Sequence, residues 1–102
     1  MPVKPALIMH PKDNVATAID EIQPGDEVRM PQGKEVRTLT ATEAIPFGFK
    51  IALDEIPQGG IIVKYGETIG KASRSIPRGT LVHIHNLEGI RARGDLEGRE
   101  RR

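Results

Sequence analysis

The sequence lacks cysteine and tryptophan, and its 102 residues include only two phenylalanines and one tyrosine. Without cysteine, this chain has no disulfide scaffold, no thiolate nucleophile and no cysteine-based zinc or iron–sulfur site. The core must be aliphatic because large side chains are so few, and a chain of this length buries only roughly two-thirds of its unfolded surface. Little room remains for a deep, enclosed active site. These shortages favour a single-domain module over a self-sufficient enzyme.

The sequence also lacks an excess of one charge and a long apolar run. Fifteen basic residues stand against fourteen acidic ones, which gives a formal net charge of +1. Such a balance provides no bulk attraction towards nucleic acid or a membrane surface. No apolar stretch approaches the ~20 residues that a membrane-spanning helix needs, and the N-terminus has no signal-peptide pattern. We expect a cytoplasmic chain that binds neither nucleic acid nor membranes.

The first part of the chain predicts a short strand and then a helix. The strand is expected over residues 6–9, before Pro11. Four apolar residues then follow the i, i+3, i+4, i+7 spacing of one helix face: Val15, Ala18, Ile19 and Ile22. Asp13 stands where an N-cap would, and the Pro24-Gly25 pair would end a helix of about two turns.

The rest of the chain is typical of β structure. Residues 27–30 and 35–41 flank a turn sequence, Pro-Gln-Gly-Lys, and predict a hairpin. The phrase Ile-Pro-x-Gly begins at Ile45, Ile56 and Ile76, and Ile22 opens a looser version. We expect proline at the second and glycine at the fourth position of each turn. A β-rich stretch follows each of the three full phrases, over residues 49–53, 61–65 and 81–85.

Together these patterns predict that residues 1–87 form one mainly β domain with one short helix. The remaining residues, 88–102, are charged, broken by glycine and free of periodic apolar positions. Such a tail cannot form a core by itself, and we expect it to be flexible alone and to become ordered on a partner.

The segment Val82-His83-Ile84-His85-Asn86 carries the most chemistry. On a strand, His83 and His85 would share a face while Ile84 points into the core. Two imidazoles so placed can contribute to a divalent-metal site or, when protonated, bind a carboxylate. A catalytic metal usually needs three protein ligands, so we do not expect this chain to hold one alone. The alternative is a solvent-facing pair at a strand end.

Two further segments offer polar groups. Lys64-Tyr65-Gly66-Glu67 predicts a tight turn in which Lys64 can neutralise a substrate carboxylate; the alternative is a hairpin turn with an exposed ion pair of little energetic value. Asp13 and Asn14 would lie at the N-terminus of the predicted helix. That terminus can cradle a carboxylate or phosphate, but the favoured interpretation is that Asp13 simply caps the helix.

Four sequence motifs occur in a distinctive order: HPKDNVATAI from residue 10, IPFGFKIAL from 45, IVKYGETIG from 62 and VHIHN from 82. This combination resembles the SAF-type domain of the altronate/galactarate dehydratase family, to which sulfolactate sulfo-lyase is also similar. The resemblance covers residues 7–87 and implies a small β-clip fold. In that family the domain is either the N-terminal part of a long enzyme or a separate small subunit. Since this chain ends soon after the domain, it resembles the separate subunit.

The resemblance implies elimination of water from an aldonic or aldaric acid, giving a 2-keto-3-deoxy acid. It also implies a large partner subunit that carries most catalytic groups and a divalent metal, expected to be Fe²⁺, with no cofactor in this chain alone. The residues expected to contact substrate or partner are Asp13, Asn14, Lys50, Lys64, Tyr65, Gly66, Glu67, His83, His85 and Asn86. His83 and His85 are the candidates for a catalytic role.

One residue departs from the family pattern. Phe49 occupies a position that is often histidine in relatives, and phenylalanine can neither transfer a proton nor bind a metal. Two other functions remain open: a stand-alone SAF-type module that binds a ligand or protein, and an independent small enzyme. The second is disfavoured because no three-ligand metal site or base–nucleophile pair is recognisable.

Overall fold

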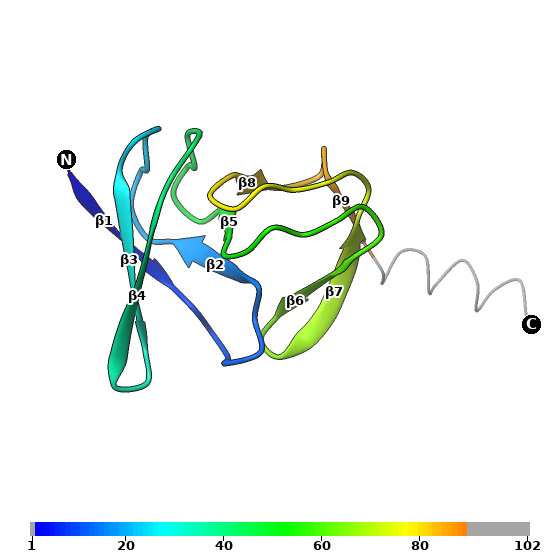
Figure 1. Cartoon of the computed structure of the whole chain (residues 1–102), viewed down its shortest axis with the longest axis horizontal. Coiled ribbons are helices and arrows are strands. Elements are labelled where there is room, and N and C mark those ends of the chain that lie inside the picture. The colour runs from blue at the N-terminus through cyan, green and yellow to red at the C-terminus, as the bar shows by residue number, and fades with distance from the viewer. Residues whose placement is uncertain (1, 90–102) are drawn as a thin grey trace, which may run out of the picture.

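The computed structural model describes residues 2–89, which form strands, turns and bends in two sheets (Figure 1). The strands in chain order are β1 (Val3–Leu7), β2 (Val15–Ala18), β3 (Glu27–Gln32), β4 (Glu35–Thr40), β5 (Lys50–Ala52), β6 (Ile61–Lys64), β7 (Glu67–Ala72), β8 (Leu81–Val82) and β9 (Leu87–Gly89). Six of them form one sheet in the order β4-β3-β1-β2-β5-β8, and the others form a second sheet in the order β6-β7-β9. Neighbouring strands are antiparallel except for β1 and β3.

Two aliphatic cores lie on opposite sides of the central strands. The larger cluster contains Ile22, Met30 and Ile51, among others, and is built on the six-stranded sheet. The second includes Val82 on β8 and Ile62 on β6, and it joins the two sheets. Each core consists almost wholly of buried Ile, Leu, Val, Met and Ala side chains, as the shortage of aromatic residues required.

The predicted helix over residues 15–22 is wrong, and no helix of any length occurs among residues 2–89. Residues 15–18 form β2, which is buried on both faces: Ala16 and Ala18 belong to the larger core, whereas Val15 belongs to the second. A strand covered on both sides is apolar at consecutive positions, so its sequence can mimic the period of a helix. Accordingly, no helix capable of crossing a membrane is found in this part of the chain.

The Ile-Pro-x-Gly phrases are the ends of longer segments that pair with one another. Each segment has alanine first, isoleucine fifth and glycine eighth, over residues 18–25, 41–48, 52–59 and 72–79. Ile22 bridges Ile45, and Ile56 bridges Ile76. The terminal glycine N–H donates to the first alanine carbonyl of the partner segment at 2.8–2.9 Å, in four bonds: Gly25 to Ala41, Gly48 to Ala18, Gly59 to Ala72 and Gly79 to Ala52. The four segments therefore form two pairs, and both pairs are joined by the same reciprocal hydrogen bonds.

The turn at each phrase is shifted from the predicted position. In the first full phrase Phe49 N–H donates to Pro46 O at 3.0 Å, so proline is first and Gly48 is third. Gly48 has a φ of 86°, which the third position of a type II turn requires and which glycine adopts without steric cost. Proline instead keeps the preceding isoleucine extended, and that isoleucine then makes the bridge.

Several local predictions are confirmed. β3 and β4 form the expected hairpin, with Gln32 opposite Glu35 and Gly33 at a φ of 63° in the turn. The stretches after the three phrases contain β5, β6 and β8, respectively. The first strand begins earlier than expected and ends at Leu7. Most of the charged tail, residues 90–102, lies outside the described residues, while its first residues belong to β9.

Candidate functional site

The Tyr65–Gly66 turn joins β6 to β7 and is held by a buried carboxylate. Tyr65 has a φ of 59° and Gly66 a φ of 74°. The left-handed conformation costs a residue with a side chain roughly 1–2 kcal/mol. Asp13 accepts the N–H of Tyr65 at 3.1 Å and that of Gly66 at 2.8 Å. Asp13 is thus a turn cap rather than a helix cap, and its two bonds offset the strain.

Asn14 attaches the same connecting segment to β6. Its Oδ1 accepts the N–H of Val63 at 2.8 Å, and its Nδ2 donates to Ile61 O at 2.9 Å. The Asn14 amide therefore makes the two hydrogen bonds to β6 that the backbone of a neighbouring strand would make. Because the helix is absent, no helix N-terminus exists here to cradle an anion, and Asp13 and Asn14 serve the architecture of the hairpin.

His10 contacts this turn, a contact that the sequence did not predict. A Cβ added to Gly66 would lie 2.8 Å from His10 Cδ2, so the imidazole packs directly on the glycine. Lys12 N–H donates to His10 Nδ1 at 3.1 Å. The neutral ring therefore carries its proton on Nε2. The closeness of His10 to Asp13 in the sequence was the only available signal.

His83 and Asn86 form a turn, so the predicted strand over residues 81–85 ends at Val82. Asn86 is buried; its Oδ1 accepts the N–H of His83 at 2.9 Å, and its Nδ2 donates to Leu81 O at 2.8 Å. Ile84 is 83% exposed, so it does not point into the core as expected. His83 and His85 therefore do not share a strand face, because the Asn86 side chain bends the backbone between them.

Phe49 packs on His83 at the position where the sequence departs from its family pattern. The ring centroids are 4.6 Å apart, and the planes are inclined by 47°. The contact fixes one face of the imidazole against an apolar ring. Phe49 therefore positions His83, while it contributes no proton or metal chemistry of its own.

Lys50 and Lys64 are the two lysines among the candidate residues. Lys50 is half-buried on β5 and lies opposite Val82, the residue before His83. Its burial, and secondly the charge of Lys64, lower the pKa of Lys50 below its ordinary value of 10.5. Lys64 Nζ lies 5.2 Å from the centroid of the Tyr65 ring, within cation–π range. His83, Phe49, Lys50, Lys64 and Tyr65 are here called the Lys–His cluster. Phe49 packs on the larger core, whereas the register partner of Lys50, Val82, belongs to the second core.

Glu67 and His85 are not held in the Lys–His cluster by any hydrogen bond or ion pair of the described residues. Glu67 lies opposite Lys64 in the hairpin register but forms no ion pair with it. His85 is exposed in its turn. Within residues 2–89, no group of three or more His, Cys, Asp or Glu side chains could hold a metal ion. These residues therefore do not fit a metal site of their own.

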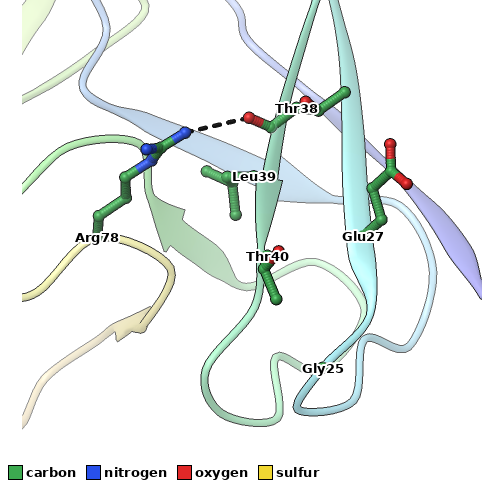
Figure 2. A pocket seen from close by; sticks show the side chains of 6 residues that line it. All are labelled: Gly25, Glu27, Thr38, Leu39, Thr40 and Arg78. Atoms are coloured by element: carbon green, nitrogen blue, oxygen red, sulfur yellow. Dashed lines mark hydrogen bonds between the residues drawn. The ribbon is translucent and has the colours of Figure 1, made fainter. Parts of the chain in front are cut away.

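One hollow of the described surface is lined by none of the residues of the Lys–His cluster. It has a volume of about 530 Å³, and its lining residues are Gly25, Glu27, Thr38, Leu39, Thr40 and Arg78 (Figure 2). Arg78 reaches across it and donates to Thr38 O at 3.1 Å. None of the predicted site residues lines this hollow. Among the candidate residues, Tyr65, Glu67 and His85 are exposed, whereas Asp13 and Asn86 are buried.

The comparisons with known proteins agree with the motifs. Residues 4–89 match the family model of the altronate/galactarate dehydratase SAF domain. Galactarate dehydratase (L-threo-forming) of Escherichia coli strain K12 is 42% identical over 74 residues, which are 72% of this chain and 13% of that protein. Altronate dehydratase of Bacillus subtilis strain 168 is 37% identical over 86 residues, 84% of this chain and 16% of the relative.

A third relative is much shorter. The alpha subunit of (2R)-sulfolactate sulfo-lyase from Paracoccus pantotrophus is 44% identical over 50 residues, which are 49% of this chain and 75% of that subunit. The dehydratases are several times longer than the matched region, since this chain spans only 13–16% of their length. The matched region is thus a part of long enzymes and also most of a lyase subunit.

Proposed function

Because the chain belongs to the altronate/galactarate dehydratase SAF domain family, we propose that it is the small, accessory subunit of a lyase acting on a hydroxy acid. The reaction is elimination of water from an aldonic or aldaric acid, to give a 2-keto-3-deoxy acid. A large partner subunit carries most of the catalytic groups. The β-clip fold and a cytoplasmic location are part of this proposal.

The observation that carries the proposal is the family match over residues 4–89, together with the similarity to a lyase subunit that consists mostly of this region. The candidate residues are compatible with it, because the described part of the chain provides an imidazole and two lysines but no group of three metal-ligating side chains. Such an arrangement is half of a site, and a second chain laid over it would exclude water and complete it.

Elimination beside a carboxylate needs a base, an acid for the leaving group and a cation that stabilises the developing negative charge. His83 is the proton-transfer candidate of this chain, and Phe49 contacts its ring. Lys50 and Lys64 supply cationic charge. A divalent metal, with Fe²⁺ as the expected ion, belongs in this proposal to the large subunit, because residues 2–89 offer no three-ligand group.

The test is to isolate the complex that forms around this chain in cells that make it. A tagged chain should co-purify with a dehydratase-like polypeptide in near-equal amounts, and the complex should form a 2-keto acid from galactarate or altronate. His83→Ala should lower turnover at least tenfold, whereas the exposed-turn variant Lys34→Met should not. A well-folded chain that recovers no such polypeptide would instead support a stand-alone binding module.

A further inference from the structure

The hollow of Figure 2 lies where the corner that carries Arg78 meets the outer edge of β4. β4 is the last strand of its sheet, so one of its edges has no neighbouring strand. The corner is fixed against that edge, because Thr42 N–H donates to Gly79 O at 2.9 Å and a Cβ on Gly79 would lie only 2.6 Å from Thr40 O. The backbone of Arg78 is therefore held in place beside β4.

The register of β3 and β4 decides which backbone groups face the hollow. Ala41 N–H donates to Asp26 O at 2.9 Å, immediately before the first ladder pair. Because hydrogen-bonded and non-hydrogen-bonded pairs alternate along an antiparallel ladder, the pairs that contain Thr40 and Thr38 are non-hydrogen-bonded. The N–H and C=O groups of these two threonines therefore point outward from the free edge of β4.

The acceptors of this edge are covered, whereas its donors are free. Arg78 donates to Thr38 O at 3.1 Å (Figure 2), and Thr40 O lies against the corner at Gly79. Among the described residues, the N–H groups of Thr38 and Thr40 have no acceptor. A sheet edge whose N–H groups point into a concave surface is a place where anions bind.

Arg78 adds a positive charge that no carboxylate compensates within residues 2–89. The ion pairs there use Lys4, Arg29 and Arg37. Arg78 makes one hydrogen bond, so most of the five N–H donors of its guanidinium are free. Among the residues that line the hollow, the one carboxylate is that of Glu27, and it is paired with Arg29 at 3.2 Å. The hollow therefore combines a free cation with free backbone donors.

We propose that this hollow binds a small organic acid through its carboxylate group. The carboxylate accepts hydrogen bonds from the Arg78 guanidinium, whose planar fork suits it, and from the N–H groups of Thr38 and Thr40. The volume of about 530 Å³ leaves room for a short carbon chain. None of the candidate residues for the lyase reaction lines the hollow, so the proposal does not depend on the proposed function.

Two other occupants fit this hollow less well. A doubly charged phosphate would be repelled by the neighbouring Glu27 more strongly than a singly charged carboxylate. A peptide strand added to the edge of β4 would need the edge acceptors as well as the donors. Arg78 already occupies Thr38 O, and so it blocks that mode of binding.

The experiment is an NMR titration of the isotopically labelled full chain with glycolate at constant ionic strength. The signals to follow are the backbone amides of Thr38 and Thr40 and the side-chain Nε–H of Arg78. Glycolamide, the neutral analogue, and doubly charged inorganic phosphate are the comparison probes. We expect saturable shifts with glycolate, a dissociation constant on the order of millimolar, no response to glycolamide and weaker binding of phosphate. The amide of His85, outside the hollow, should not move.

Arg78→Gln should weaken glycolate binding about tenfold or more, and Arg78→Lys, which keeps the charge but loses the fork, should weaken it less. The matched control is Arg74→Gln, because Arg74 is exposed on the same alanine-to-glycine segment and does not line the hollow. It should bind like the wild type.

The absence of saturable shifts in the wild type up to about 100 mM glycolate would overturn the site, and so would unchanged affinity of Arg78→Gln. Phosphate binding that is tighter than glycolate binding would overturn the assignment of the ligand as a carboxylate. Either result leaves the proposed function intact, and a chain without a lyase partner would still be expected to bind glycolate here.

Discussion

Gly59 and Gly79 are each the last residue of an alanine-to-glycine segment, but their surroundings differ. Their φ values are 85° and 87°, so an added side chain is strained at both positions. A Cβ at Gly79 would lie 2.6 Å from Thr40 O, whereas a Cβ at Gly59 meets nothing within 4 Å. One position therefore tests the backbone conformation alone, and the other tests conformation plus close packing.

Gly59→Ala should destabilise the chain by roughly 1–2 kcal/mol through its backbone conformation. Gly79→Ala should cost about 1–3 kcal/mol more, because the carbonyl of Thr40 belongs to a paired strand and cannot move freely. Urea unfolding of the two variants measures the difference. Equal losses would show that the close approach at Gly79 relaxes without cost.

Thr17 provides a second prediction, since its buried hydroxyl has no hydrogen-bond partner. Thr17→Val keeps the shape and removes the unsatisfied group, so it should leave stability unchanged or raise it by up to about 1 kcal/mol. The matched control is Thr80→Val, because Thr80 Oγ1 donates to Pro77 O at 2.7 Å. The control should lose about 0.5–1.5 kcal/mol, and an equal loss at Thr17 would reveal a bond that the structure lacks.

Lys50 gives a pH-dependent prediction. Burial, and then the charge of Lys64, lower the pKa of Lys50 in the folded chain, so between that pKa and 10.5 the unfolded chain binds more protons. The wild-type free energy of unfolding should therefore gain a contribution from Lys50 as pH rises through this window. Below this pH window, the folded chain bears the full cost of keeping the charged Lys50 partly buried near Lys64.

Lys50→Met removes the charge and keeps an apolar stem. The variant should be more stable than the wild type at pH 7, and its advantage should shrink towards pH 10.5. Urea midpoints measured at both pH values test this, with Lys34→Met as the control. If the stability difference between Lys50→Met and the wild type is the same at both pH values, the titration of Lys50 is not its cause.

At the scale of elements, the β6–β7 hairpin is less stable than it could be, because its turn holds the exposed Tyr65 in a left-handed conformation. Tyr65 occupies a left-handed position that Asn would adopt more readily, since Asn-Gly is a preferred pair in two-residue hairpins. Apart from its contact with Lys64, an exposed tyrosine at that position adds little to the stability of the hairpin. We interpret it as a contact residue for the partner or the substrate.

Tyr65→Asn should therefore raise the free energy of unfolding by about 0.5–1 kcal/mol and at the same time weaken association with the large subunit. Asp13→Ala should do the opposite to stability and cost about 1–3 kcal/mol, because two turn amides lose their acceptor. Thermal unfolding and a binding assay on both variants separate the effects. A Tyr65→Asn chain that is both more stable and fully competent in binding would refute the contact role.

At the scale of the whole molecule, local signals predicted local structure. The β3–β4 hairpin and the Tyr65-Gly66 turn follow from glycine and the residues beside it, which need few distant contacts. The helix prediction failed because β2 is buried on both faces by strands distant in sequence. The strand predicted through His83 failed because a single buried side chain, that of Asn86, bends it into a turn.

The site was only partly predictable for the same reason. The motifs identified Lys64, Tyr65 and His83, but the nearness of Lys50 to Lys64 depends on two sheets that come together only in the folded chain. The reciprocal pairing of the four alanine-to-glycine segments is likewise non-local. Ordering of the tail on a partner remains a prediction, since residues 90–102 lie outside the described residues.

The most direct test of the account is add-back of this chain to the purified large subunit, with 2-keto acid formation from galactarate and altronate as the readout. We predict little turnover by either chain alone and full turnover by the pair. A His83→Ala chain should bind the large subunit normally but restore at most a tenth of the activity. A large subunit that is fully active without this chain would contradict the central claim.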